Sequence, residues 1–218
     1  MKKITRVIFV RHGESDGNLK GKICGWHEAI LTDLGRKQAR FTGEFLKDKG
    51  IDVFYSSDLT RARQTAEIIG ESLNLPITFD QRLRERSCGV LDGMPIDEAV
   101  KHSGWYGFMF TPNGRVEGGE TITELNYRSS EFLKEIVEKH KDKTTLIVSH
   151  GGVLWSLVPF VLGVSIELYN GYVGMDNCSI NVFAHSDNFA LEVLNQTSHL
   201  GYFLQDNPFW QFLFCSNA

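Results

Sequence analysis

The sequence lacks an excess of positive charge and a long apolar run, and each absence excludes a class of protein. Its 27 acidic residues outnumber its 23 lysines and arginines, which argues against general binding to nucleic acids and other polyanions. The first apolar segment is too short for a signal peptide or a membrane span. We therefore expect a cytoplasmic protein that has neither nucleic acid nor membrane as a partner.

Metal-binding motifs are also missing. None of the four cysteines stands in a CxxC pair, and the seven histidines include no HExxH pattern. We expect no metal site, and we expect free thiols in a reducing compartment. No linker, low-complexity tract or solenoid-type repeat divides the chain. Its length suits one domain over residues 1–218.

Short β-branched runs alternate with amphipathic stretches along the chain. We expect strands at residues 4–10, 51–55, 76–79, 144–148, 179–184 and 190–194, and helices at residues 32–49, 60–73, 95–102, 121–140 and 152–162. The last two strands read as an antiparallel pair. This alternation predicts an α/β fold, a three-layer α/β/α sandwich with a largely parallel sheet and an antiparallel edge.

Two aromatic segments fall outside this pattern. Residues 94–120 form a lid-like insertion whose least regular part, residues 104–119, carries a run of aromatic side chains at 105–110. That run either covers the leaving-group side of a pocket or packs a helix against the sheet. The aromatic C-terminal tail, residues 201–218, must be buried on its own domain, in a homodimer contact or beside the pocket.

Two predicted strands end in the same dipeptide, His12-Gly13 and His150-Gly151. Ligands of open α/β sheets lie just beyond the carboxyl ends of the strands. If these two strands are neighbours, both imidazoles meet at that edge. This pair locates the expected site better than any other feature of the sequence.

The motifs around both pairs extend over nearly the whole chain. In chain order they are Arg11-His12-Gly13-Glu14-Ser15, Asn18, Gly25-Trp26, Ser56-Ser57-Asp58-Leu59 with Arg61-Ala62 and Gln64-Thr65-Ala66, Leu83-Arg84-Glu85, Gly118-Gly119-Glu120-Thr121 and Ser149-His150-Gly151-Gly152. In these motifs the chain resembles the phosphatase branch of the histidine phosphatase superfamily, also called the phosphoglycerate-mutase-like family. The resemblance implies an enzyme that acts on a small phosphorylated metabolite.

The resemblance implies that four side chains contact the phosphoryl group of the substrate. His12 is the expected nucleophile, because a neutral imidazole nitrogen can attack phosphorus and leave again. Arg11 and Arg61 would hold the phosphoryl oxygens, since guanidinium presents paired donors and stays charged. His150 would donate a hydrogen bond to the same group, where negative charge develops during transfer.

Glu85 is the expected general acid, and after transfer it would activate water. The dianion of an arriving phosphate favours the protonated form of a nearby carboxyl group. The resemblance also places Asn18, Gly25 and Gly151 in substrate binding. Asn18 has an alternative role as a loop residue that tolerates an unusual backbone angle. Glu14 is expected to stabilise the loop or a nearby helix N-terminus.

We expect no cofactor, because two arginines and two imidazoles supply the positive field that Mg²⁺ gives other phosphoryl-transfer enzymes. Phosphoglycerate mutases of this family carry a longer insertion that is rich in lysine and arginine, whereas residues 94–119 hold more aromatics than cations. The sequence therefore favours hydrolysis of a phosphate monoester through a phosphohistidine. The alternatives are a cofactor-dependent phosphoglycerate mutase and a non-catalytic phosphate-binding module.

Overall fold

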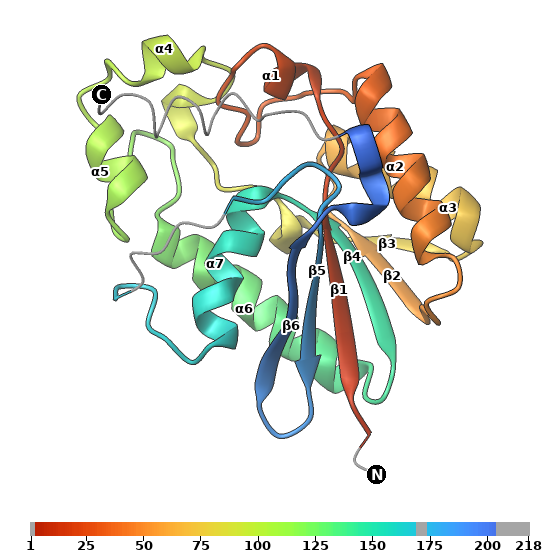
Figure 1. Ribbon diagram of the computed structural model, residues 1–218. Coiled ribbons are helices and arrows are strands. Elements are labelled where there is room, and N and C mark those ends of the chain that lie inside the picture. Colours follow the sequence, from red (N-terminus) through yellow and green to blue (C-terminus); the bar gives the residue numbers. More distant parts are fainter. Residues whose placement is uncertain (1–2, 169–173, 204–218) are drawn as a thin grey trace.

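The computed structural model describes residues 3–168 and 174–203 (Figure 1). Its helices and strands are β1 (Thr5–Arg11), α1 (Asp16–Leu19), α2 (Asp33–Leu46), β2 (Val53–Ser56), α3 (Thr60–Leu73), β3 (Ile77–Phe79), α4 (Ile96–Ala99), α5 (Trp105–Phe110), α6 (Ile122–Lys139), β4 (Thr144–Ser149), α7 (Gly151–Val161), β5 (Ile180–His185) and β6 (Phe189–Gln196). Three 3₁₀ segments are η1 (Gln81–Leu83), η2 (Gly89–Leu91) and η3 (Ser198–Phe203).

The described strands form one sheet in the order β3-β2-β4-β1-β5-β6. The first four run parallel, whereas β5 is antiparallel to both β1 and β6. The predicted α/β class with a largely parallel sheet and an antiparallel edge is confirmed. In the register, Arg11 lies opposite Ser149 on the neighbouring strand β4. The segments that follow β1 and β4 therefore leave the sheet side by side.

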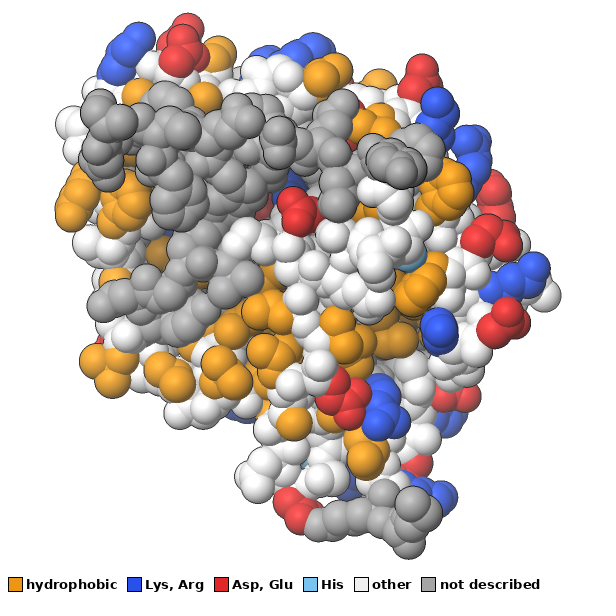
Figure 2. All heavy atoms as spheres, viewed as in Figure 1, with side chains coloured by type: hydrophobic (Ala, Val, Ile, Leu, Met, Phe, Trp, Pro, Cys, Tyr) orange, Lys and Arg blue, Asp and Glu red, His pale blue; other side chains and the backbone are white. Residues whose placement is uncertain are grey.

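Alternating side chains of β1 divide the core between the two faces of the sheet, as the pleat requires. Ile8 and Val10 pack with residues of α2 and α3, and Val7 and Phe9 pack with residues of α6 and α7. Figure 1 shows these two helix pairs on opposite sides of the sheet. On the visible part of α2 and α3, basic and acidic side chains are interspersed (Figure 2).

The aromatic run at 105–110 forms the helix α5, although the sequence predicted an irregular segment there. Trp105 and Phe108 are buried in a small cluster with Leu91 and its neighbours, and this packing stabilises the single helical turn. Tyr106 and Phe110, on its other side, are exposed. Local periodicity could not predict the helix, because its partners lie elsewhere in the chain.

The short helix α1 was also not predicted, since it lies inside the glycine-rich stretch 13–25. A capping box explains its start: Ser15 Oγ accepts from the Asn18 N–H, and the Asn18 side chain accepts from the Ser15 N–H. The aromatic run at 208–215, and with it the suggested homodimer contact, lies outside the described residues. Within residues 3–168 and 174–203, no helix is both long and apolar enough to cross a membrane.

Candidate active site

The two His-Gly pairs meet at the carboxyl edge of β1 and β4, as their register requires. The ring centroids of His12 and His150 are 5.2 Å apart. Both side chains are buried, and the His12 N–H donates to the Ser149 carbonyl at 2.9 Å. The sequence-based expectation that the two imidazoles share one edge of the sheet is thus met by the structure.

One ring nitrogen of His12 is oriented by the backbone. Its Nδ1 lies 2.7 Å from the Gly13 carbonyl oxygen, which can only accept, so Nδ1 carries the hydrogen. The lone pair is then on Nε2, to which Arg61 Nε donates at 3.2 Å. Burial first, and then the charges of Arg61 and Arg11, hold the pKa of His12 well below its ordinary value. His12 is therefore neutral and can act as a nucleophile.

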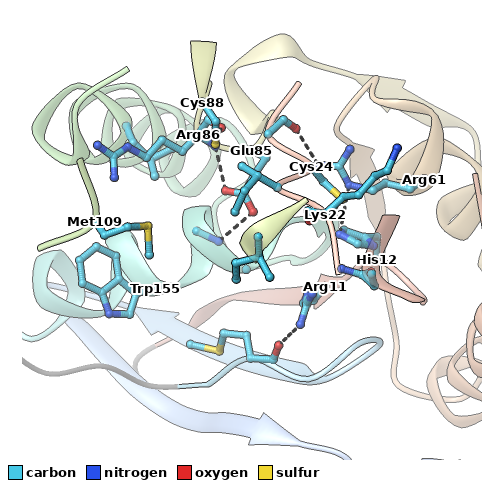
Figure 3. Close-up of a pocket in the computed structure, with 18 of the residues that line it drawn as sticks. Arg11, His12, Lys22, Cys24, Arg61, Glu85, Arg86, Cys88, Met109 and Trp155 are labelled. Atoms are coloured by element: carbon cyan, nitrogen blue, oxygen red, sulfur yellow. Dashed lines mark hydrogen bonds between the residues drawn. The ribbon is translucent and has the colours of Figure 1, made fainter. Parts of the chain in front are cut away.

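Arg61 lies at the N-terminal end of α3, and its side chain is almost fully buried. Its guanidinium donates to the carbonyl oxygens of Gly25 at 2.8 Å and of His27 at 3.2 Å. On the other side of His12, Arg11 ends β1 and donates to the Met175 carbonyl oxygen. Both arginines line, together with His12, a cavity of about 440 Å³ (Figure 3). The arrangement can hold an anion beside His12 Nε2.

His150 is held by a residue that the sequence analysis did not select. Its Nε2 lies 2.8 Å from the Ser57 Oγ, while its buried Nδ1 has no hydrogen-bond partner among the described residues. Ser57 Oγ also accepts from the Leu59 N–H at 3.4 Å, and its hydroxyl hydrogen can be donated to Nε2. With Nε2 accepting, His150 carries its own hydrogen on Nδ1. His150 is not among the described residues that line the cavity, so its contact with a phosphoryl oxygen stays a prediction.

This geometry predicts that Ser57 acts through the tautomer of His150. In Ser57→Ala, Nε2 loses its donor, so both tautomers are populated. We expect kcat/KM for a phosphate monoester to fall about tenfold to hundredfold, somewhat less than loss of a whole donor costs. Ser57→Thr keeps a hydroxyl group and should restore most of the rate. Nitrogen-15 NMR of His150 checks the cause: an alanine variant that keeps the Nδ1–H tautomer and the full rate would contradict this role.

Glu85 faces the cavity from the loop between η1 and η2. Its carboxylate accepts from the Arg86 N–H at 2.8 Å and from the Gly152 N–H, in the first turn of α7, at 3.1 Å. A Cβ on Gly152 would stand 2.1 Å from Glu85 Oε1, so only glycine allows this approach. The Glu85 carbonyl accepts from Trp26 Nε1 and Arg128 Nη2 at 2.7 and 2.8 Å. Glu85 is thus fixed where it can exchange a proton with a ligand.

The predicted substrate-binding residues also line the cavity. Asn18 has a helical backbone, so the alternative of an unusual backbone angle is wrong. Its Oδ1 is engaged by Ser15 and by Asn177 Nδ2, which leaves its amide N–H groups for a ligand. Gly25 and Gly151 line the same cavity. Their direct contact with substrate stays a prediction.

Three further side chains complete the surroundings. Glu14 accepts from the Thr32 hydroxyl, the N-cap of α2, at 2.6 Å, in line with its expected role at a helix start. Cys24 and Cys88 line the cavity as free thiols. Burial raises the pKa of both, so both are protonated rather than reactive thiolates.

The sequence analysis missed Ser57, Arg86, Trp26 and Asn177 as site residues. Ser57 and Trp26 stand inside the motifs that carried the family resemblance, so their position was the available signal. Asn177 donates to the His12 carbonyl at 2.9 Å from a segment far along the chain. Arg86 has no such signal, because a loop arginine is usually solvated.

Comparison with known proteins identifies one superfamily. A family model described as the histidine phosphatase superfamily (branch 1) matches residues 7–197. An uncharacterized phosphatase PhoE of Bacillus subtilis is 34% identical over 202 residues, which cover 93% of this chain and 100% of the relative. A probable phosphoglycerate mutase GpmB of Salmonella paratyphi B is 35% identical over 204 residues, 89% of this chain and 94% of the relative.

A solved structure supports the fold. YhfR of Bacillus stearothermophilus superposes with a TM-score of 0.85 at 29% sequence identity, covering 90% of this chain and 99% of its own. The names of the relatives include both phosphatase and mutase. Similarity therefore supports an enzyme that acts on phosphate, and the choice between the two reactions depends on the residues of the cavity.

Proposed function

This chain belongs to the histidine phosphatase superfamily (branch 1), and we propose that it is a metal-independent phosphatase that hydrolyses a small phosphate monoester through a phosphohistidine at His12. The observation that carries the proposal is the neutral His12, whose Nε2 lies between two arginines and accepts a hydrogen bond from Arg61, which an arriving phosphoryl group would replace. Glu85 stands across the same cavity as a source of protons.

The first half of the reaction forms the phosphohistidine. His12 Nε2 attacks phosphorus, a P–N bond forms, and the P–O bond to the alcohol breaks in line with the attack. The departing oxygen takes a proton from the Glu85 carboxyl group and leaves as an alcohol. Arg11, Arg61 and the Nδ1–H of His150 hold the equatorial oxygens, where negative charge is concentrated.

The second half returns the enzyme to its starting state. The Glu85 carboxylate removes a proton from water, whose oxygen attacks the same phosphorus from the side that the alcohol left. The P–N bond breaks, inorganic phosphate is released, and Glu85 ends protonated again. Each half needs one group to give or take a proton, and Glu85 serves both.

A phosphate-release screen in the presence of excess EDTA tests this proposal. Among the described residues, no group of three or more His, Cys, Asp or Glu side chains is arranged to hold a metal ion. We therefore expect release of phosphate from at least one small monoester at a rate that EDTA leaves unchanged. Activity that disappears with EDTA and returns with Mg²⁺ would contradict a metal-independent reaction.

A cofactor-dependent phosphoglycerate mutase is the second candidate, because relatives at 35% identity carry that name. Such an enzyme must hold a second acidic group, and Lys22 is the cavity-lining cation whose side chain has no partner among the described residues. The screen tests this candidate by including 3-phosphoglycerate with a bisphosphoglycerate primer. Isomerisation that outpaces phosphate release would favour the mutase.

A further inference from the structure

The cavity extends well beyond the phosphoryl site, and its far part is apolar. Figure 3 shows Arg11, His12 and Arg61 toward one end, Met109 and Trp155 toward the other, and Glu85 between them. Further apolar lining comes from Ile23, Ile96, Phe108, Ile122, Leu125 and Met175. A volume of about 440 Å³ is in the range of pockets that enclose a whole small molecule, so the apolar part has room for more than a phosphate group.

Arg86 lines this cavity, and most of its hydrogen-bond donors are used within the protein. Its guanidinium donates to the carbonyl oxygens of Phe108 at 2.7 Å, Gly114 at 2.9 Å and Glu120 at 2.7 Å. It also stacks 3.7 Å above the Phe108 ring. Burial lowers its pKa to about 10, still well above neutral pH, so the group remains charged. Arg86 therefore fixes α5 as a wall of the cavity, and these contacts use three of its five N–H groups.

Lys22 belongs to the other end of the cavity. Figure 3 shows it on the side of His12 and Arg61, away from Met109 and Trp155. On the Met109 side of Glu85 the lining cation among the described residues is Arg86, and three of its five N–H groups are held by backbone carbonyls (Figure 3). The rest of the lining there is apolar, so an uncharged portion of a substrate is buried there without the cost of desolvating a charge.

The in-line geometry of the displacement determines which part of the substrate lies in the apolar part of the cavity. The leaving oxygen lies opposite His12 in an in-line displacement, and it must contact Glu85 to be protonated. Because Glu85 lies between His12 and the apolar end, the alcohol portion extends toward Met109 and Trp155. We propose that this apolar part is a subsite for the uncharged alkyl or aryl portion of the phosphate monoester. The substrate class rests on the proposed phosphatase activity.

Alkylphosphonates, which cannot be hydrolysed at the P–C bond, measure the subsite separately from catalysis. Each buried methylene strengthens binding about threefold to fourfold. We expect butylphosphonate to bind about tenfold more tightly than ethylphosphonate in calorimetry. We also expect kcat/KM for butyl phosphate to exceed that for ethyl phosphate by about the same factor, with 3-phosphoglycerate the poorest of the three.

Met109 and Phe110, neighbours in α5, provide a matched pair of variants, and Trp155 of α7 provides a third. Met109→Ala and Trp155→Ala should reduce the butyl-to-ethyl ratio to within about threefold of unity. Phe110→Ala, next to Met109 but exposed and outside the lining, should keep the ratio of the unmodified protein. A butyl-to-ethyl ratio that falls equally in all three variants would contradict a subsite formed by Met109 and Trp155.

The two experiments separate the subsite from the activity. Equal binding of both phosphonates, or a preference for 3-phosphoglycerate, would overturn the subsite even if esters are hydrolysed. Tight butylphosphonate binding without hydrolysis of any ester would support the subsite and overturn the proposed phosphatase.

Discussion

Replacing His12 removes essentially all turnover of phosphate monoesters in the mechanism proposed above. We expect His12→Ala to lower kcat by at least about 10⁴-fold, because no other group described in the cavity is a neutral nucleophile aimed at the anion site. His12→Asn should be equally inactive, although its amide can still donate to the Gly13 carbonyl and preserve the loop. The measurement is steady-state phosphate release, with circular dichroism to establish folding.

A histidine outside the cavity provides the control. His185 ends β5 and packs against Phe189, far along the chain from the two His-Gly pairs. His185→Ala should retain the activity of the unmodified protein. Near-normal turnover in either His12 variant would show that the reaction does not pass through this imidazole.

The Glu85→Gln variant should separate substrates by their leaving groups. An alkoxide needs a proton as the P–O bond breaks, whereas nitrophenolate leaves without one. We expect a loss of about 10²–10⁴-fold in kcat for an alkyl phosphate, the usual contribution of general acid catalysis. The first step with nitrophenyl phosphate, followed as a nitrophenolate burst, should slow less than about tenfold.

The substitution is conservative in geometry. Glutamine can still accept from the Gly152 N–H, so the N-terminus of α7 keeps this contact. Glu117→Gln, an exposed acid elsewhere in the insertion, is the matched control and should leave both rates unchanged. Equal losses in the first step for both substrates would contradict Glu85 as the general acid.

Much of this site could be predicted because it depends on strand ends. His12 and His150 each follow a β-branched run that predicts a buried parallel strand, so both were expected at the carboxyl edge of the sheet. The structure then places the two strands side by side. Glu85 and Arg61 were predicted from motifs that resemble the family. Their positions in the cavity agree with those roles, while the roles themselves await the variants described above.

The unpredicted features depend on contacts between segments distant in sequence. The helix α5 forms because Trp105 and Phe108 find apolar partners near Leu91 and Ile23. From the sequence, Arg86 is expected to be a solvated loop arginine. In the structure it donates to three backbone carbonyls between residues 108 and 120. The residues next to α5 and Arg86 in the sequence do not indicate these apolar and carbonyl partners. The wall of the cavity could therefore not be predicted from the sequence.

The most direct test of the central claim is to trap the covalent intermediate. In Glu85→Gln, nitrophenyl phosphate should still phosphorylate His12, whereas the base that activates water is absent, so the intermediate accumulates. Alkaline quenching followed by peptide mass spectrometry should locate an acid-labile phosphoryl group on His12. Release of nitrophenolate without phosphate on His12, or with phosphate on another residue, would contradict the account.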